Sequence, residues 1–142
     1  MENLSRLKAL IAIVGVSASL AALAPAPALA DISAGCIVRY GKLTTSDGYL
    51  NFGAQVCPTF VKTWGTIKDT KSDSWTAVAE VDIYAGSKVV DGGAWEAGRK
   101  AGKKTYSVSS GRVDLTKLRI RARRCLPSTI VCNNTQTKTY TF

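Results

Sequence analysis

The chain has 142 residues, with 19 Lys and Arg, 10 Asp and Glu and no histidine, which gives a formal net charge of +9 at pH 7. The absence of histidine removes the usual general base at neutral pH and the imidazole ligand of most metal sites. We therefore expect no enzyme, no metal site and no cofactor.

The first thirty residues follow the order that is typical of a secretory signal peptide. Cations precede an apolar run over 9–22, and the segment ends in Ala28-Leu29-Ala30. The run is shorter than the about 20 apolar residues of a spanning helix. We expect that residues 1–30 are removed, and that the chain is secreted, extracellular and without a transmembrane span. A lipoprotein is the alternative, since Ala34-Gly35-Cys36 resembles a lipid-attachment box.

Residues 31–142 are enough for a single small domain, and this part holds all the cysteines. An even number of cysteines in an exported chain predicts two disulfides, for which three connectivities are possible. We favour Cys36 with Cys57 and Cys125 with Cys132, because each pair brackets a segment that resembles a hairpin. Each bridge would contribute about 3 kcal/mol through the unfolded chain.

The first half of this domain reads as short strands separated by turns. Residues 36–40 are β-branched and aromatic, and 42–48 have turn composition. Residues 49–57 alternate between apolar and polar, which predicts a hairpin with 36–40. Residues 60–68 alternate more weakly, as in an edge or twisted strand.

The clearest core strand follows a polar turn over 69–74. One face of this strand is apolar and the other mixed. The predicted inward residues are Trp75, Ala77, Ala79, Val81 and Ile83.

Residues 92–105 contain four glycines and four cations and read as a long loop, a feature that is often functional or mobile. Trp95 in this loop either anchors a ligand or folds back onto the domain. The cations that accompany it are Arg99, Lys100, Lys103 and Lys104.

The remaining elements are a short strand over 106–109, a strand over 112–125 that is either continuous or has a bulge near Thr116, and a final strand over 135–142. No stretch has a sustained helical period. Seven or eight short strands in about a hundred residues predict an all-β fold, a small disulfide-stapled antiparallel β-sandwich of immunoglobulin-like or similar topology.

The strand over 118–125 carries the strongest signal for a binding surface. Arg119, Arg121 and Arg123 alternate with apolar residues, so they line one face, with neighbours about 6.5 to 7 Å apart. The charge is uneven, since residues 31–96 have six Lys and Arg against eight Asp and Glu, while 97–142 have eleven against one. The candidate binding face comprises these arginines with Trp95, Arg99, Lys100, Lys103 and Lys104. The alternative is a solvated strand face.

Two pairs of carboxylates are candidates for chemistry. Asp69 and Asp73 share a turn and have the composition of an acid pair or calcium ligands, but Asp is also an ordinary turn residue. Glu80 and Asp82 share the outer face of a strand, which is commonly the wet face. We expect no catalytic residue here.

The segment from 65 to 132 resembles small secreted β-sandwich proteins that are abundant in actinobacteria. The likeness lies in Asp69-Thr-Lys-Ser-Asp73 before a strand, a Gly-rich segment, Leu118-Arg-Ile-Arg-Ala-Arg-Arg-Cys125 and a closing Cys132. Most such proteins have no known activity, and some comparable ones are adaptor subunits of extracellular antibacterial toxin assemblies. The chain also resembles secreted subtilisin inhibitors in size, but its cysteine spacing departs from theirs and no reactive-site loop can be placed.

Two functions follow as expectations. The first is a non-catalytic module that binds another secreted protein through a strand edge or the cationic face. The second is a cationic protein that binds an anionic cell-envelope polymer or acts as an antimicrobial. Specific recognition of nucleic acid is not expected.

Overall fold

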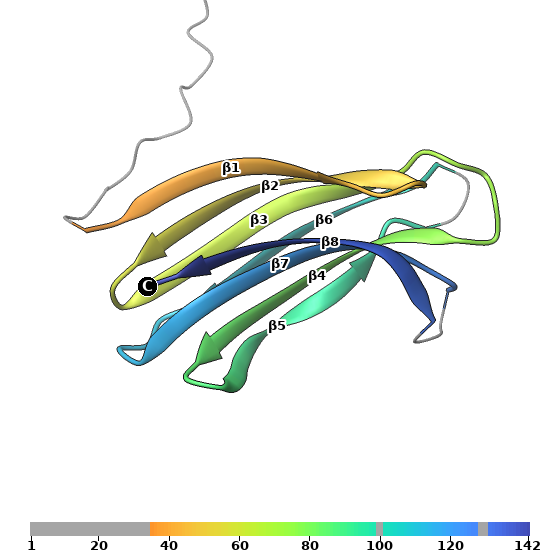
Figure 1. Cartoon of the computed structure of the whole chain (residues 1–142). Coiled ribbons are helices and arrows are strands. Elements are labelled where there is room, and N and C mark those ends of the chain that lie inside the picture. The colour runs from red at the N-terminus through yellow and green to blue at the C-terminus, as the bar shows by residue number, and fades with distance from the viewer. Residues whose placement is uncertain (1–34, 99–100, 128–130) are drawn as a thin grey trace, which may run out of the picture. The chain divides into compact units, whose positions relative to one another are not determined.

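The computed structural model describes residues 35–98, 101–127 and 131–142, and these form two four-stranded antiparallel sheets (Figure 1). Sheet A has the order β1 (Ile37–Thr44), β2 (Gly48–Cys57), β3 (Phe60–Asp69) and β6 (Lys103–Ser110). Sheet B has the order β5 (Lys88–Glu96), β4 (Thr76–Ala85), β7 (Leu115–Cys125) and β8 (Cys132–Thr141). The predicted all-β sandwich is confirmed. The expected signal peptide lies outside the described residues.

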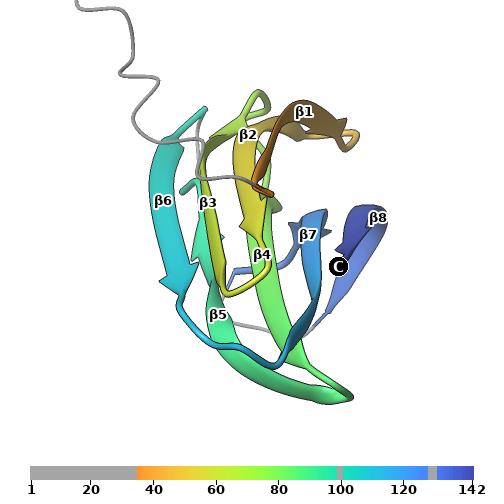
Figure 2. The same cartoon turned by 90° about the vertical axis from the view of Figure 1, so that its left-hand side faces the viewer.

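The chain crosses between the sheets after β3, β5 and β6, so that β3 pairs with β6 and β4 with β7. Strand β6 returns to β3 after β4 and β5 have formed in the other sheet, and β7 returns to β4 in the same way. Connections of this kind are typical of Greek-key folds. Figure 2 shows the two sheets facing each other, with β5 and β6 at one side and β1 and β8 at the other. The immunoglobulin-like topology within this class stays a prediction.

The core lies between the inner faces of the sheets. Ala77, Ala79, Val81 and Ile83 of β4 are completely buried, which confirms the predicted core strand. Full burial of a side chain such as Ile83 stabilises the fold by about 1.5 to 3 kcal/mol. The prediction for Trp75 was wrong, because this residue precedes β4 and is only half-buried.

Both disulfides have the predicted pairing. Cys36 is bonded to Cys57 and closes the β1–β2 hairpin, and Cys125 is bonded to Cys132 and closes the β7–β8 hairpin. Two bridges of this kind point to an oxidising compartment. In the part of the chain that the structure describes, no helix has the length and hydropathy to cross a membrane.

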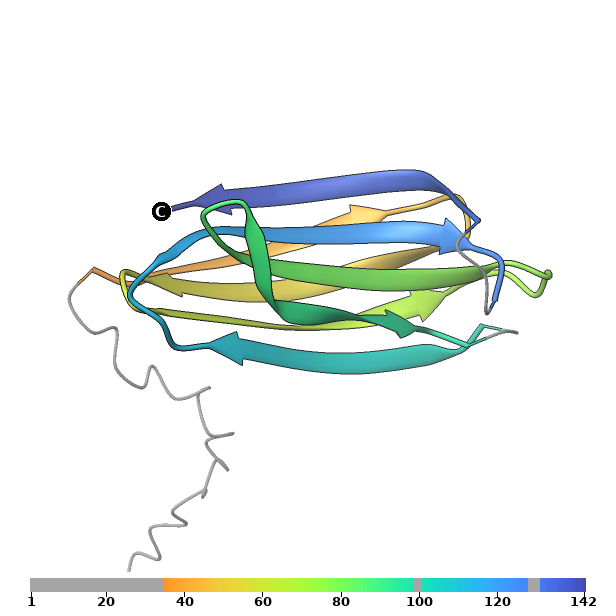
Figure 3. The same ribbon diagram turned by 90° about the horizontal axis from the view of Figure 1, so that it is seen from below.

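The prediction of a long loop over 92–105 was wrong. Strand β5 continues to Glu96 and β6 begins at Lys103. Gly92 has a φ of 145°, and a Cβ there would lie 2.1 Å from the carbonyl oxygen of Val81, so this glycine permits close pairing with β4. Figure 3 shows β5 bending so that its second half runs beside β6.

The bulge near Thr116, one of the two predicted alternatives for β7, is confirmed. Tyr84 is opposite Lys117 while Ala85 is opposite Leu115, which leaves Thr116 without a partner in the register. The Thr116 hydroxyl donates instead to the carbonyl oxygen of Tyr84, at 3.3 Å. The side-chain hydroxyl of the bulged residue therefore has a hydrogen-bond partner within the fold.

Candidate binding surfaces

The three predicted arginines line the outer face of sheet B, but each is paired with a carboxylate of β4. Arg119 Nη2 lies 2.9 Å from Asp82 Oδ2, and Arg121 Nη2 lies 3.1 Å from the same oxygen. Arg121 also donates to Glu80, and Arg123 Nη1 lies 2.7 Å from Glu80 Oε2. We call these five residues the arginine ladder. Positive and negative charges alternate along it.

The ladder is partly withdrawn from water. The side chain of Arg121 is 20% exposed and that of Asp82 is 16% exposed. Charge-assisted hydrogen bonds in such surroundings are worth more than exposed ion pairs. The predicted outward orientation of Glu80 and Asp82 is correct, and their role is to neutralise the arginines. The ladder thus joins β4 to β7 and leaves little free charge for a ligand.

The other predicted cations do not join the ladder. Lys103 lies on the outer face of sheet A, opposite Lys68 of β3. Lys104 shares the alternation of the inward Tyr106, yet it is exposed at the start of β6. Arg99 and Lys100 lie outside the described residues. The predicted binding face is therefore divided between two sheets, which corrects its treatment as one surface.

Trp95 folds back onto the sandwich, one of the two predicted alternatives. It lies opposite the buried Ala79, and its ring stacks on Tyr106 with centroids 4.9 Å apart. The Tyr106 hydroxyl is 3.2 Å from Thr63 Oγ1, and burial raises the pKa of Tyr106 to about 12. Trp95 thus closes the edge between β5 and β6, and the alternative of an exposed ligand anchor is wrong.

The turn carboxylates lie in an ion cluster at one end of the sandwich. Asp47 is completely buried and accepts hydrogen bonds from Arg124 and from Lys71, whose Nζ is 3.2 Å from Asp47 Oδ1. Asp69 is also buried and accepts from the backbone N–H of Lys71 at 2.9 Å, and Asp73 accepts from that of Trp75.

Arg124 and Lys71 neutralise the carboxylates at this end of the sandwich, so the ion cluster stabilises the fold. Burial raises the pKa of Asp69, whereas hydrogen bonds from Arg124 and Lys71 outweigh burial at Asp47 and lower its pKa. Arg124 Nη2 also lies 3.4 Å from Asp73 Oδ2. Within the described ranges, no three potential metal ligands are grouped. The cluster connects the β1–β2 turn to the end of β7.

The outer face of sheet A carries a surface that the sequence analysis did not single out. Its outward positions follow from the register of the four strands, in which opposite residues share a face. We call it the aromatic–lysine face, and define it by Tyr40, Lys42, Tyr49, Asn51, Gln55, Lys62, Trp64, Thr66, Lys68, Lys103, Thr105, Ser107 and Ser109.

The centre of this face is a row that runs across three strands. Tyr40 of β1 is opposite Gly53 of β2, which is opposite Trp64 of β3. A Cβ at Gly53 would lie 2.5 Å from Trp64 Cε2 and Cζ2, so the indole lies across the glycine. Tyr40 meets Trp64 edge to face, with centroids 6.1 Å apart and an angle of 81° between the rings.

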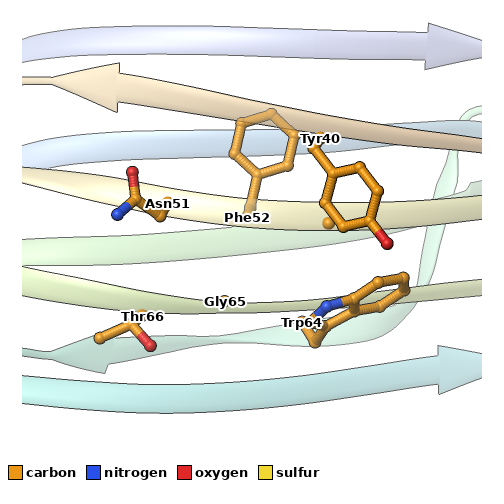
Figure 4. Close-up of a pocket in the computed structure, with 7 residues that line it drawn as sticks. Tyr40, Asn51, Phe52, Trp64, Gly65 and Thr66 are labelled. Atoms are coloured by element: carbon orange, nitrogen blue, oxygen red, sulfur yellow. The ribbon is translucent and has the colours of Figure 1, made fainter. Parts of the chain in front are cut away.

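A shallow cavity of about 260 Å³ opens at this row. Figure 4 shows Tyr40 over β2 and Trp64 on β3, with Asn51 and Thr66 further along these two strands. The lining residues are Tyr40, Asn51, Phe52, Gly53, Trp64, Gly65 and Thr66.

Lysines surround the aromatic row without carboxylates to balance them. Lys42 Nζ lies 4.4 Å from the ring centroid of Tyr49, and Lys62 Nζ lies 5.9 Å from that of Trp64. Lys68 and Lys103 are opposite each other, an arrangement of like charges that destabilises a strand pair. Among the described residues of β1, β2, β3 and β6, no Asp or Glu takes an outward position.

This surface was not identified from the sequence. The shared face of Lys62, Trp64 and Thr66 is visible in the alternation of β3. Tyr40 is 24 positions earlier than Trp64, so the register that brings them together through Gly53 is not visible in either strand alone. The one sequence signal for this contact is Gly53, a glycine in the strand between the strand with Tyr40 and the strand with Trp64.

No protein-family model, curated protein or solved structure matches this chain.

Proposed function

We propose that this chain is an exported, non-catalytic binding module that attaches to an anionic polymer of the cell envelope through the aromatic–lysine face. The observation that carries the proposal is the set of four lysines, Lys42, Lys62, Lys68 and Lys103, on a sheet face where the described residues place no carboxylate. Such a one-sign surface attracts extended polyanions. The arginine ladder lacks this property because its charges are paired.

The proposals that the chain is exported and that it is not an enzyme are supported by the N-terminal sequence, the disulfides and the residue composition. The N-terminal sequence has the pattern of a signal peptide, and both disulfides suit an oxidising compartment. The sequence has no histidine, and all four cysteines are in disulfides, so a thiol nucleophile and the usual general base are missing.

Cosedimentation of the purified, disulfide-bonded protein with isolated cell-envelope polymer tests the proposal. With three or four lysines engaged, we expect the affinity to fall by about 20- to 150-fold between about 50 and 200 mM salt. The double variant Lys42→Gln/Lys62→Gln should bind more weakly and with a shallower salt dependence. The control Lys88→Gln/Lys138→Gln has the same change of charge on sheet B.

The arginine ladder supplies a second comparison. Arg121→Gln should lower the stability of the protein and leave its polymer affinity close to that of the wild type, because Arg121 is bound to Glu80 and Asp82. Binding that ignores salt, or that fails with Arg121→Gln in a folded protein but survives loss of Lys42 and Lys62, would count against the aromatic–lysine face.

A second candidate function is an adaptor that binds another secreted protein, as in an extracellular antibacterial toxin assembly. The observation that favours it is β8, whose residues 133–139 are exposed and which pairs only with β7 among the described strands. A free edge of this kind can accept a strand from a partner. Native purification from culture medium at low salt would yield a stoichiometric partner; recovery of a lone monomer argues against the adaptor.

A further inference from the structure

The centre of the aromatic–lysine face has features that plain charge attraction does not require. Tyr40 is 74% exposed, although a ring of this size usually loses most of its surface in a folded domain. Its neighbour Trp64 is half-buried and lies across Gly53. Two aromatic rings therefore border one small, open cavity in the middle of a polar sheet face.

The rows beside the rings carry hydrogen-bonding and charged groups in a fixed order. The row that contains Lys42 continues through Asn51, Thr66 and Thr105 across the sheet. On the other side of the rings, Lys62 belongs to a row with Val38, Gln55 and Ser109. Successive rows lie about 6.5 to 7 Å apart along the strands. A lysine therefore stands on either side of the aromatic row.

This order matches the chemistry of an acidic polysaccharide. A sugar ring has an apolar face of C–H groups, which packs on an aromatic ring, and a rim of hydroxyls, which bond to amide and hydroxyl side chains. Carboxylate or phosphate groups on the neighbouring sugars of the same chain would then lie over the lysine rows. The cavity of about 260 Å³ is shallow and open, so a sugar ring would lie in it with one face against the aromatic side chains and the other towards solvent.

Resting on the function proposed above, we propose that the shallow cavity bordered by Tyr40 and Trp64 is a subsite for one sugar ring of an acidic polysaccharide, whose flanking anionic groups pair with Lys42 and Lys62. Charge complementarity selects the polymer as acidic, since the described residues of this face hold lysines and no carboxylate. The aromatic pair selects it as a glycan. Trp64 is held by the sheet through Gly53, so one wall of the subsite is preformed.

An acidic protein and single-stranded nucleic acid are the competing ligands. A protein partner needs an interface of about 800 Å² per side in which lysine is depleted, whereas this face carries four lysines with amides and hydroxyls around its three aromatic rings. Single-stranded nucleic acid needs a succession of stacking platforms along its backbone. Here Tyr40 and Trp64 meet edge to face and form a single site.

Calorimetric titration at low salt with five probes tests the subsite. Polygalacturonate carries sugars and carboxylates, a teichoic-acid-type glycan carries sugars and phosphodiesters, and dextran carries sugars without charge. Polyglutamate supplies carboxylates without sugars, and oligothymidylate represents single-stranded nucleic acid. The two acidic glycans distinguish carboxylate from phosphate as the anionic group, and either of them as the tightest ligand supports the proposal.

The variants separate stacking from charge. Tyr40→Ala should weaken acidic-glycan binding by about tenfold, because a well-placed aromatic contact contributes up to roughly one power of ten in affinity. Tyr40→Phe keeps the ring and should bind nearly as the wild type does. The pair Lys42→Gln/Lys62→Gln should weaken both acidic glycans and polyglutamate, with Lys88→Gln/Lys138→Gln as the matched control. Near-ultraviolet circular dichroism checks that each variant is folded.

The failures are distinguishable. Equal binding of polygalacturonate and polyglutamate, with no effect of Tyr40→Ala, would overturn the sugar subsite and leave the polyanion-binding function standing. Binding of no polyanion at low salt would overturn both. Oligothymidylate as the tightest ligand, or equal losses in the lysine variant and its control, would also refute the subsite.

Discussion

Asp47 in the β1–β2 turn offers the sharpest test of how the two sheets are held together. Its carboxylate is completely buried and accepts hydrogen bonds from Arg124 at the end of β7 and from Lys71 after β3. Its carbonyl oxygen accepts from the N–H and hydroxyl of Thr70, at 2.7 and 2.9 Å. Asp47→Asn keeps the shape of the side chain and the backbone bonds, and removes only the charge.

The magnitude follows from what the variant leaves behind. Removing one partner of a fully buried ion pair costs about 3 to 5 kcal/mol. The value here is smaller, because the Lys71 side chain is 52% exposed and Arg124 keeps Asp73 Oδ2 at 3.4 Å. Relief of the repulsion between Asp47 and Asp69 lowers the cost further. We expect Asp47→Asn to lower the free energy of unfolding at neutral pH by about 2 kcal/mol.

The pH dependence gives the same prediction an independent check. Burial by itself raises the pKa of Asp47, but hydrogen bonds from Arg124 and Lys71 outweigh it and hold the pKa below its usual value. The stabilisation by this carboxylate is therefore present above the unfolded pKa, about 4, and is lost as the pH falls through the folded value. The difference between the wild type and Asp47→Asn should shrink below that pH.

Urea denaturation with the disulfides intact measures the difference at about pH 7 and again near pH 2.5. Asp114→Asn is the control, because the Arg112–Asp114 pair is about half exposed on both sides and should contribute nothing measurable. A cost at pH 7 no larger than that of the control would refute the reasoning, as would a difference that persists in acid.

Three further predictions concern substitutions of single residues. Burial raises the pKa of Asp69, and repulsion from Asp47 raises it further. The stability that Asp69 contributes is therefore present below its unfolded pKa and is lost as the pH rises through its folded pKa. We expect Asp69→Asn to be no less stable than the wild type at pH 7, and a clear loss of stability in urea denaturation would contradict this. Burial raises the pKa of Tyr106 to about 12, so Tyr106→Phe should remove one late-titrating phenol from the absorbance titration, and an unchanged curve near pH 12 speaks against it. Gly53→Ala places a Cβ 2.5 Å from the indole of Trp64, so it should shift the tryptophan emission and reduce polymer binding, whereas unaltered fluorescence and affinity would show that the ring does not lie there.

The fold could be predicted where the residues of one strand or one hairpin are enough to identify it. The alternation over 77–83 identified the central strand of sheet B, and the paired cysteines identified two hairpins. The glycines over 92–98 misled the prediction because glycine marks both loops and close approaches of two backbones. Gly92 belongs to the second class, and only the position of Val81 on the neighbouring strand shows it.

The candidate site could not be predicted in the same way, because alternation gives the face of a side chain and not its partners. Arg119 and Arg121 were placed on the correct face of β7, but the carboxylates that neutralise them lie 37 to 41 positions away on β4. Tyr40 and Trp64 likewise meet only through the register of three strands. Strand pairing is set by the whole sandwich, so these contacts have no local signature.

The distribution of charge along the chain does not show which cations the folded surface leaves unpaired. Residues 31–96 are acidic overall, yet they supply Lys42, Lys62 and Lys68 to the aromatic–lysine face. The fold withdraws their acidic neighbours from this face, since Asp47 and Asp69 are buried and the carboxylates of β4 lie on the opposite sheet. The C-terminal half is strongly basic, but Arg119, Arg121 and Arg123 use their charge within sheet B. The proposed polymer would therefore meet mainly cations of the acidic segment, because the charge that a folded surface exposes differs from the net charge of the segment that supplies it.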